Sequence, residues 1–317
     1  MRLVVTGAVG HIGSRLVRDA AKVFPDAQIV MVDNMSSQRY ASLFDLPQRA
    51  RYEFIEADVT ATDLNGIING ADALIHLAAL TSDAATAAEM ERVNVGGTER
   101  VAAACAARGV PMLFPSTTSV YGASGHIDEN DADRALGPQT PYAGWKLQSE
   151  QHLQERARRD GLRVAIFRMG TIFGPSPGMH FDTAVNRFCW QAMMERPLAA
   201  WRTALDQDRP YLYLGDAVAA MLTVTRQQAF DGRVYHVATT NATVRQVIRV
   251  LEDLVPGLSV ACVDSPHMNQ LSFTVDTRRL RELGFAVTGT LASGIADTIT
   301  LLRAVQSGRA SLARVPK

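Results

Sequence analysis

A tyrosine and a lysine four positions apart are the residues of this sequence best suited to proton transfer. Tyr142 and Lys146 occur in the run PYAGWK, whose proline suits the first turn of a helix. Residues four positions apart share one face of a helix. A tyrosine hydroxyl, with a pKa of about 10, is a weak base at pH 7, but a nearby positive charge favours the phenolate and lowers that pKa. Such a tyrosine could remove the proton of an alcohol while a hydride leaves the same carbon.

A second hydroxyl could hold the oxygen of the same alcohol. Thr117 lies 25 positions before Tyr142, and its neighbour Thr118 is the alternative. A tyrosine and a lysine at helical spacing also occur together by chance, so the fold around them decides the interpretation. The hydride also needs an acceptor, which has to be sought elsewhere in the sequence.

Three glycines near the start of the chain predict a dinucleotide site. They follow a predicted strand and open a predicted helix in the run TGAVGHIG. One glycine allows a tight turn, one lets the backbone approach a diphosphate, and one lets the helix pack closely on the strand. The unpaired N–H groups and the dipole at the helix start attract phosphate, although a plain tight turn is the alternative. The residues expected at the phosphates are Gly7, Gly10, His11, Ile12 and Gly13.

An acidic residue at the end of the second predicted strand supports this interpretation. Asp33 follows Gly13 by 20 residues, where a carboxylate can bind the ribose hydroxyls of the adenosine half and repel a 2′-phosphate. Asp33 and its neighbour Asn34 therefore favour NAD over NADP. The alternative is that these two residues form only a turn at the end of the strand.

Two further fragments fit the same site. Asp58 and Val59 end the third predicted strand, where a carboxylate and a backbone group can meet an adenine edge. Leu77, Ala78 and Ala79 end the fourth, and their small side chains would let a dinucleotide lie against the backbone.

The elements that carry these residues alternate between β-type runs and helical patterns, which is typical of parallel βαβ units. Runs such as LVV and IVMV are apolar without alternation, as in strands covered on both faces. The expected strands are 2–6, 28–33, 52–57, 73–77, 112–115 and 163–168, and the expected helices are 12–23, 61–68, 85–107 and 141–159. The predicted fold class is α/β, with a doubly wound parallel (Rossmann) sheet.

After residue 168 the pattern becomes irregular, and a smaller C-terminal substrate lobe is expected. Residues 170–180 are rich in glycine and proline. Beyond them we expect helices at 184–194, 216–226, 244–254 and 298–306, and strands at 211–214 and 233–237. The predicted division is an NAD-binding domain over 1–168, with 209–238 returning to it, and a substrate lobe over 169–208 and 239–317.

Composition excludes several classes of function. The 32 basic and 32 acidic residues balance, so no charge excess favours nucleic acid or an anionic membrane. Cys105, Cys189 and Cys262 are odd in number and far apart, which suits reduced thiols rather than disulfides or a metal site. No segment approaches the roughly 18 apolar residues of a membrane-spanning helix, and the N-terminal apolar run is too short for a signal peptide. We expect a soluble, cytoplasmic protein without a metal.

The order of these motifs resembles that of a known family. Between residues 2 and 285 the sequence contains TGAVGHIG, VDN, ADV, HLAA, NVGGT, STTSVYG, PYAGWK, FRMGTIFGP, DRPYLYLGD and DTRRLRELGF. In this it is similar to the extended short-chain dehydrogenases/reductases of the nucleotide-sugar epimerase/dehydratase family. The resemblance implies that Tyr142 is the catalytic tyrosine, Thr117 the catalytic hydroxyl, and Lys146 the lysine that binds the nicotinamide ribose. It also implies that Asn94, in NVGGT, supports the site from its helix.

The resemblance also bears on the reaction. Dehydratases of the family carry an acidic pair after the catalytic threonine, and related decarboxylases a glutamate, whereas this chain has Thr118 and Ser119. The run TTSVYG is similar to that of 4-epimerases, which implies transient oxidation at C4 of a nucleotide-diphosphate sugar by tightly held NAD. The alternatives are an NAD-dependent sugar or alcohol dehydrogenase or ketoreductase and, less favoured, a dehydratase or an NAD-sensing binding protein.

Substrate residues and partners are implied in the same way. Arg209 resembles an arginine that meets the diphosphate of the substrate, but Pro210 stands where the family usually has Asp. Thr171 stands where many relatives carry an asparagine that contacts substrate, and Thr118 is the other expected contact. Gly170 and Ile172 are expected near the nicotinamide. The helices at 85–107 and 141–159 resemble those through which relatives form homodimers.

Overall fold

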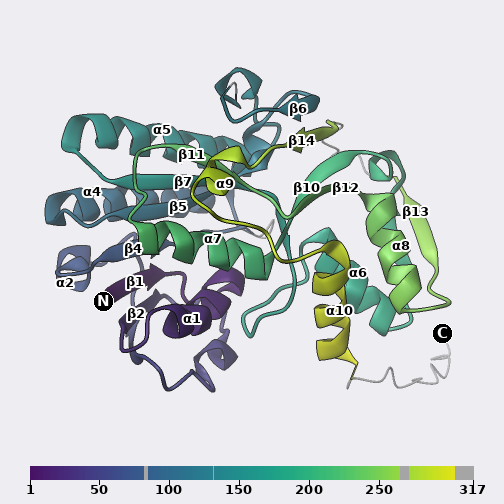
Figure 1. The fold of residues 1–317 in the computed structure, drawn as a ribbon, viewed down its shortest axis with the longest axis horizontal. Helices are drawn as coiled ribbons and strands as arrows, with labels where there is room; N and C mark the ends of the chain where they lie inside the picture. Colours follow the sequence, from purple (N-terminus) through teal and green to yellow (C-terminus); the bar gives the residue numbers. More distant parts are fainter. Residues whose placement is uncertain (82–84, 131, 265–270, 304–317) are drawn as a thin grey trace, which may run out of the picture.

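Seven parallel strands form the main sheet (Figure 1). The computed structural model describes residues 1–81, 85–130, 132–264 and 271–303. The strand order is β11-β7-β5-β4-β1-β2-β3. The bounds are β1 Arg2–Thr6, β2 Gln28–Asp33, β3 Arg51–Glu56, β4 Ala73–His76, β5 Met112–Thr117, β7 Val164–Met169 and β11 Val234–Val237. The order runs outward in both directions from β1 and β4, which confirms the predicted doubly wound α/β sheet.

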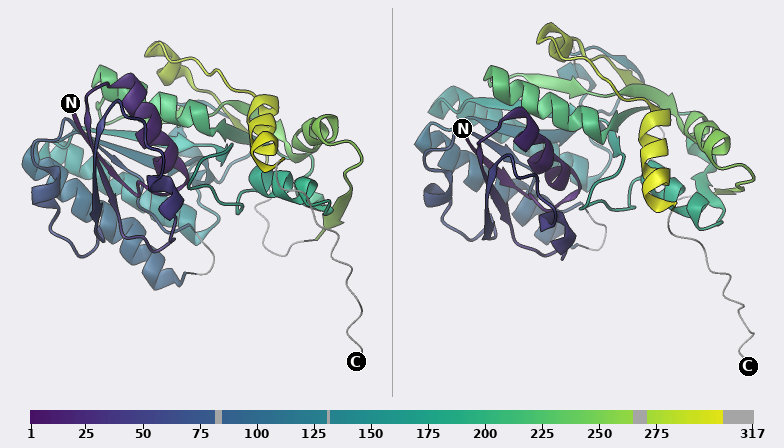
Figure 2. Two further views of the ribbon diagram at one scale, coloured as in Figure 1. Left: turned by 90° about the horizontal axis from the view of Figure 1, so that it is seen from below. Right: turned by 60° about the horizontal axis from the view of Figure 1, so that its bottom comes forward.

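Helices cover both faces of this sheet (Figure 2). On one face lie α1 (His11–Val23) and α7 (Leu214–Gln227), and on the other lie α2 (Leu64–Ile68), α4 (Thr98–Arg108) and α5 (Pro141–Asp160). In β1, Leu3 and Val5 belong to the core under α1, and Val4 belongs to the core under α4. Burial on both faces explains why the central strands are apolar without alternation.

The helix predicted at 85–107 is divided into three segments. They are α3 (Ala87–Glu91), the π-helical segment η2 (Arg92–Gly97) and α4. A capping box between Thr86 and Glu89 starts α3. In the wider π turn the Asn94 amide donates to the Leu80 carbonyl at 2.9 Å and accepts from the Leu80 N–H at 2.8 Å. This side-chain clamp gives the π turn a structural reason, which periodicity alone does not reveal.

Helix α2 is also shorter than predicted. It begins at Leu64 rather than near residue 61. The Asp63 carboxylate accepts the N–H of Asn65 at 3.0 Å and so caps the helix. The residues before it form a turn in which Asp58 accepts both the N–H and the hydroxyl of Thr60.

Apart from the main sheet, the chain forms a separate apolar core and several short strands. A three-stranded sheet has the order β12-β10-β8, and two-stranded sheets pair β13 with β9 and β14 with β6. The bounds are β6 Gly125–Ile127, β8 Thr171–Phe173, β9 Leu198–Trp201, β10 Asp208–Tyr213, β12 Thr240–Thr243, β13 Val260–Val263 and β14 Phe273–Val275. Helices α6 (Ala184–Met193), α8 (Val244–Leu254) and α10 (Leu291–Leu302) pack around this core, and α9 (Arg278–Glu282) packs near β11.

Several elements of this half differ from the sequence prediction. Strand β8 lies inside the irregular segment after residue 168, where no strand was predicted, and α10 begins at Leu291 rather than at residue 298. Residues 304–306 of that predicted helix lie outside the described residues. Strand β10 joins the small three-stranded sheet, whereas β11 joins the main sheet beside β7. Among the described residues, no helix combines the length and apolar character needed to cross a bilayer.

Candidate active site

A cavity of about 540 Å³ opens at the carboxyl ends of the central strands, the usual place for ligands in open α/β sheets. Its volume lies in the range of roughly 300–1,000 Å³ that is typical of small-molecule sites. Most residues predicted from the sequence line it: Gly7, Gly10, His11, Ile12, Gly13, Asp33, Asn34, Asp58, Val59, Leu77, Ala78, Ala79, Thr117, Tyr142, Gly170, Thr171 and Ile172. Asn94, Thr118, Lys146 and Arg209 lie elsewhere.

The glycine loop between β1 and α1 has the geometry of a phosphate cradle. Gly7 has φ +68°, and a Cβ there would lie 2.6 Å from the Ala78 nitrogen, so only glycine fits between the loop and the end of β4. At Gly13 a Cβ would lie 2.3 Å from the Gly7 carbonyl oxygen, which explains the close packing of α1 on the turn.

The start of α1 leaves hydrogen-bond donors free. Gly10 is the N-cap of the helix, and its carbonyl accepts the Ser14 N–H at 2.9 Å. Among the described residues, nothing accepts the N–H groups of His11, Ile12 and Gly13. These donors at the positive end of the helix dipole fit an anionic diphosphate.

Asp33 lies at the carboxyl end of β2 and faces the cavity. Its carboxylate accepts the N–H groups of Val9 at 3.2 Å and Met35 at 3.0 Å. Burial raises the pKa of Asp33. Each carboxylate oxygen can accept a further hydrogen bond, so the side chain can hold the loop and still bind ribose hydroxyls.

Tyr142 lies in the first turn of α5, where the Thr140 side chain caps the helix and Pro141 starts it. Its hydroxyl makes no hydrogen bond to any described residue, and the side chain lines the cavity. Burial raises the pKa of Tyr142 to about 12. The protein alone therefore does not produce the lower pKa that we expected from the neighbouring ammonium.

Lys146 is buried one turn further along the same helix. Its Nζ donates to the Pro115 carbonyl at 2.8 Å and lies 4.6 Å from the ring centroid of Phe114 and 6.0 Å from that of Tyr142. Burial lowers the pKa of Lys146 to about 8. The ammonium therefore lies beside the tyrosine but hydrogen-bonds to the backbone of β5.

The end of β5 supplies two hydroxyl side chains to the cavity. Thr117 Oγ1 accepts the Ser119 N–H at 3.1 Å, which leaves its own proton available as a donor. Ser116, which the sequence reasoning missed, is 3% exposed, and its Oγ has no partner among the described residues. A buried unpaired hydroxyl in a cavity wall is suited to a polar ligand.

The remaining predicted residues lie behind or beside the cavity. Asn94 is 2% exposed and holds the Leu80 backbone, and its carbonyl accepts the Ser149 hydroxyl at 3.0 Å. Thr118 is 4% exposed. The Arg209 guanidinium lies 5.2 Å from the Phe273 ring centroid and donates to Gln207 at 3.2 Å.

Other cavity residues come from loops that sequence motifs did not mark. They include Arg39, from the connection after β2, and His180, Asp182 and Thr183, from the segment after β8. The only sequence signal for them is position: Arg39 follows Asp33, His180 ends the glycine- and proline-rich run of residues 170–180, and Asp182 and Thr183 follow that run.

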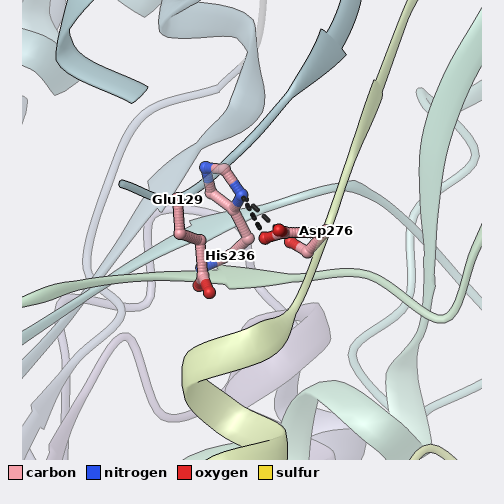
Figure 3. A group of neighbouring side chains, drawn as sticks. All are labelled: Glu129, His236 and Asp276. Carbon is pink, nitrogen blue, oxygen red and sulfur yellow. Dashed lines mark hydrogen bonds and ion pairs between the residues drawn. The ribbon is translucent and has the colours of Figure 1, made fainter. Parts of the chain in front are cut away.

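Outside the cavity, Glu129, His236 and Asp276 form a compact group (Figure 3) whose potential ligand atoms lie within 4.8 Å of one another. Glu129 already accepts the N–H groups of His236 at 2.6 Å and Arg279 at 2.7 Å. The His236 ring faces the Asp276 carbonyl at 3.0 Å and hydrogen-bonds to the Tyr121 hydroxyl. These bonds join β11 to the β6 and β14 region, so we assign the group a structural role.

Comparison with known proteins adds independent findings. Residues 3–238 match the model of the NAD dependent epimerase/dehydratase family. A UDP-glucose 4-epimerase of Mycolicibacterium smegmatis is 28% identical over 319 residues, which cover 96% of this chain and 99% of the relative. Trifunctional plant relatives are longer, and the chain spans 46% of their length.

Solved structures show the same fold. UDP-glucuronic acid 4-epimerase from Bacillus cereus, in complex with UDP-glucuronic acid and NAD, has a TM-score of 0.85 and 23% identity, covering 96% of this chain and 99% of that one. DesIV, a dTDP-glucose 4,6-dehydratase from Streptomyces venezuelae with NAD and TYD bound, has a TM-score of 0.81 and 27% identity, covering 96% and 97%.

Proposed function

The chain belongs to the NAD dependent epimerase/dehydratase family, and from that premise we propose that it is an NAD-dependent epimerase of a nucleotide sugar that acts at C4. The observation that carries the proposal is one cavity that Tyr142, Thr117 and the glycine loop line together. Proton transfer and dinucleotide binding can therefore take place in the same site.

The residues of the cavity fit the coenzyme. The free N–H groups at the start of α1 suit its diphosphate, and Asp33 suits the ribose of its adenosine half. When bound there, NAD would supply a hydride acceptor for the sugar carbon and the donor for the hydride's return. Lys146 lies beside Tyr142 on α5, where its ammonium can bind a ribose hydroxyl of the nicotinamide half.

Tyr142 is the proposed acid and base. Its hydroxyl has no partner among the described residues, so it is available to the C4 hydroxyl of the sugar. The pKa of about 12 that burial gives Tyr142 has to fall before it can act as a base at neutral pH. The charge of Lys146 and the positive charge of the oxidised coenzyme would both favour the phenolate. Thr117 can hold the substrate oxygen and so orient it toward Tyr142.

The residues after Thr117 support epimerisation over elimination. Elimination of water needs an acid and a base at neighbouring carbons, whereas Thr118 is buried and Ser119 carries no charge. The 4-keto sugar would therefore turn over in the site, and hydride would return to its other face. Because the hydride would return to the same sugar, the reaction would consume no external oxidant.

The substrate and the assembly are also proposed. Thr171 lines the cavity, and we propose it as a contact to the nucleotide sugar. Arg209 and Thr118, the other substrate residues that the resemblance implies, do not line this cavity. We propose a homodimer through α4 and α5, which lie side by side on one face of the sheet. The three free thiols support a reducing compartment such as the cytoplasm.

The test uses a panel of UDP-, GDP- and dTDP-sugars with the purified protein and no added NAD. Proton NMR should show a C4 epimer with one of them, and Tyr142→Phe, which keeps the ring, should show none. Stoichiometric NADH formation would instead indicate a dehydrogenase, and a 4-keto-6-deoxy product a dehydratase.

A further inference from the structure

The histidine of the glycine loop is buried without a hydrogen-bond partner. His11 is 6% exposed, it lines the cavity, and neither ring nitrogen has a partner among the described residues. Burial lowers the pKa of His11 to about 3, so the ring is neutral and offers one donor and one acceptor. Buried polar groups in proteins are nearly always paired, which makes a ligand in this cavity the natural partner.

Two further nitrogen-bearing side chains, those of His180 and Arg39, lie near the His11 ring. The ring centroid of His180 lies 5.2 Å from that of His11. Arg39 Nη1 lies 4.0 Å from the position that a Cβ on Gly10 would occupy. The Arg39 side chain makes no hydrogen bond or ion pair within the described part of the chain. A free guanidinium and an unpaired imidazole therefore meet beside the phosphate cradle.

The segment 174–183, which we call the strap, holds His180 in this place. Ser176 Oγ donates to the His11 carbonyl at 2.8 Å, and the Gly178 N–H donates to Ser14 Oγ at 3.0 Å. A Cβ on Gly178 would lie 2.2 Å from a carbonyl oxygen of the glycine loop, so the strap lies directly on this loop. The Asp182 N–H donates to His180 Nδ1 at 3.3 Å and so orients the ring.

We propose that His11, His180 and Arg39 form a second wall of the phosphate site and bind the diphosphate of the dinucleotide together with the N–H groups of α1. This inference rests on the proposed function, because it takes NAD as the ligand. Three backbone N–H groups cannot saturate the oxygens of a diphosphate or neutralise its charge. Arg39 supplies a formal charge, and the imidazoles supply directional donors. The charge of Arg39 also offsets that of Asp33, which lines the same cavity.

Calorimetric binding of NAD, ADP and adenosine to the full chain, after removal of bound nucleotide, tests this wall. His11→Phe keeps an aromatic ring, and Arg39→Met keeps a long side chain. Each variant should bind NAD and ADP about tenfold more weakly than the wild type, because hydrogen bonds to phosphate are lost. The Kd of adenosine, which has no phosphate, should stay within about twofold of the wild-type value. His11→Gln keeps an N–H donor and should recover most of the loss.

Two control variants lie outside the cavity. Arg49→Met removes an exposed charge from the same connection as Arg39, and His126→Phe removes an exposed histidine that bonds to Thr274. Both should bind NAD as the wild type does.

The outcomes separate this inference from the proposed function. Unchanged NAD affinity in both cavity variants would overturn the second wall while leaving the coenzyme assignment in place. An equal loss of affinity for NAD and for adenosine would mean that His11 and Arg39 only support the loop. That result would also overturn the second wall. If the wild type bound neither NAD nor ADP, the proposed function itself would fail.

Discussion

Replacing Lys146 by Met should abolish turnover without destabilising the protein at pH 7. Burial lowers the pKa of Lys146 from 10.5 to about 8, and at about 1.4 kcal/mol per pKa unit this costs the folded state roughly 3 kcal/mol at neutral pH. The variant also loses the hydrogen bond to the Pro115 carbonyl and the contact with the Phe114 ring, together worth about 2–3 kcal/mol. The two effects nearly cancel, so stability at pH 7 should change by no more than about 1 kcal/mol.

The pH dependence isolates the charge of this lysine. Between pH 8 and 10.5 the folded protein has lost the Lys146 proton, whereas the unfolded chain still binds it. The unfolded state then binds more protons, so stability rises with pH in this window. The free energy of unfolding of the wild type should therefore increase by up to roughly 3 kcal/mol relative to Lys146→Met between pH 7 and 10.5.

Urea denaturation of both proteins at pH 7, 9 and 10 measures this difference. Lys22→Met is the matched control, because the Lys22 side chain is 60% exposed and pairs with Asp19 on the surface. Its difference from the wild type should not depend on pH in this way. A constant difference between the wild type and Lys146→Met across the window would refute a desolvated ammonium beside Tyr142.

Further predictions concern the loop, the core and the chemistry. Gly7→Ala places a Cβ 2.6 Å from the backbone after β4 at φ +68°, and should lower thermal stability by about 1–3 kcal/mol and weaken NAD binding in calorimetry. Glu150→Leu removes the buried carboxylate 2.7 Å from Arg168, which is 1% exposed, and leaves it the Tyr121 hydroxyl and the exposed, more distant Asp133, and should cost about 3–5 kcal/mol in urea denaturation. Asp33→Ala should weaken the binding of NAD about tenfold and reduce the preference for NAD over NADP, both measured by competitive binding. Tyr142→Phe should lower kcat by about 10²–10⁴-fold with the Kd of NAD unchanged; retained turnover would contradict its role as base.

Local sequence predicted the parts of the fold that short-range physics determines. The bounds of β1 and β2 are those expected, because both strands are continuous apolar runs between turns. The glycine loop was also predictable from local sequence. The close approaches at Gly7 and Gly13 leave no room for a Cβ, so the loop requires glycines at fixed positions, and these are visible in the sequence. Tyr142 reaches the cavity because the proline and the cap before it set the first turn of α5.

The missed features depend on contacts between distant segments. Ser176 and His11 are 165 residues apart, so no motif near the glycine loop could indicate that the strap covers it. The π turn of η2 needs the Leu80 backbone, which lies outside the helix that periodicity describes. Arg209 of β10 lies against Phe273 of β14 rather than in the cavity wall, and nothing in the sequence around Arg209 indicates this contact with a residue 64 positions away.

The most direct test of the central claim follows the hydrogen at C4 of the substrate. The purified protein is incubated in ordinary water, without added NAD, with the accepted nucleotide sugar carrying deuterium at C4, and the product is analysed by NMR and mass spectrometry. Our account predicts a C4 epimer that retains the deuterium at C4. An epimer that has exchanged this deuterium for solvent hydrogen would contradict transient oxidation at C4 in the cavity of Tyr142.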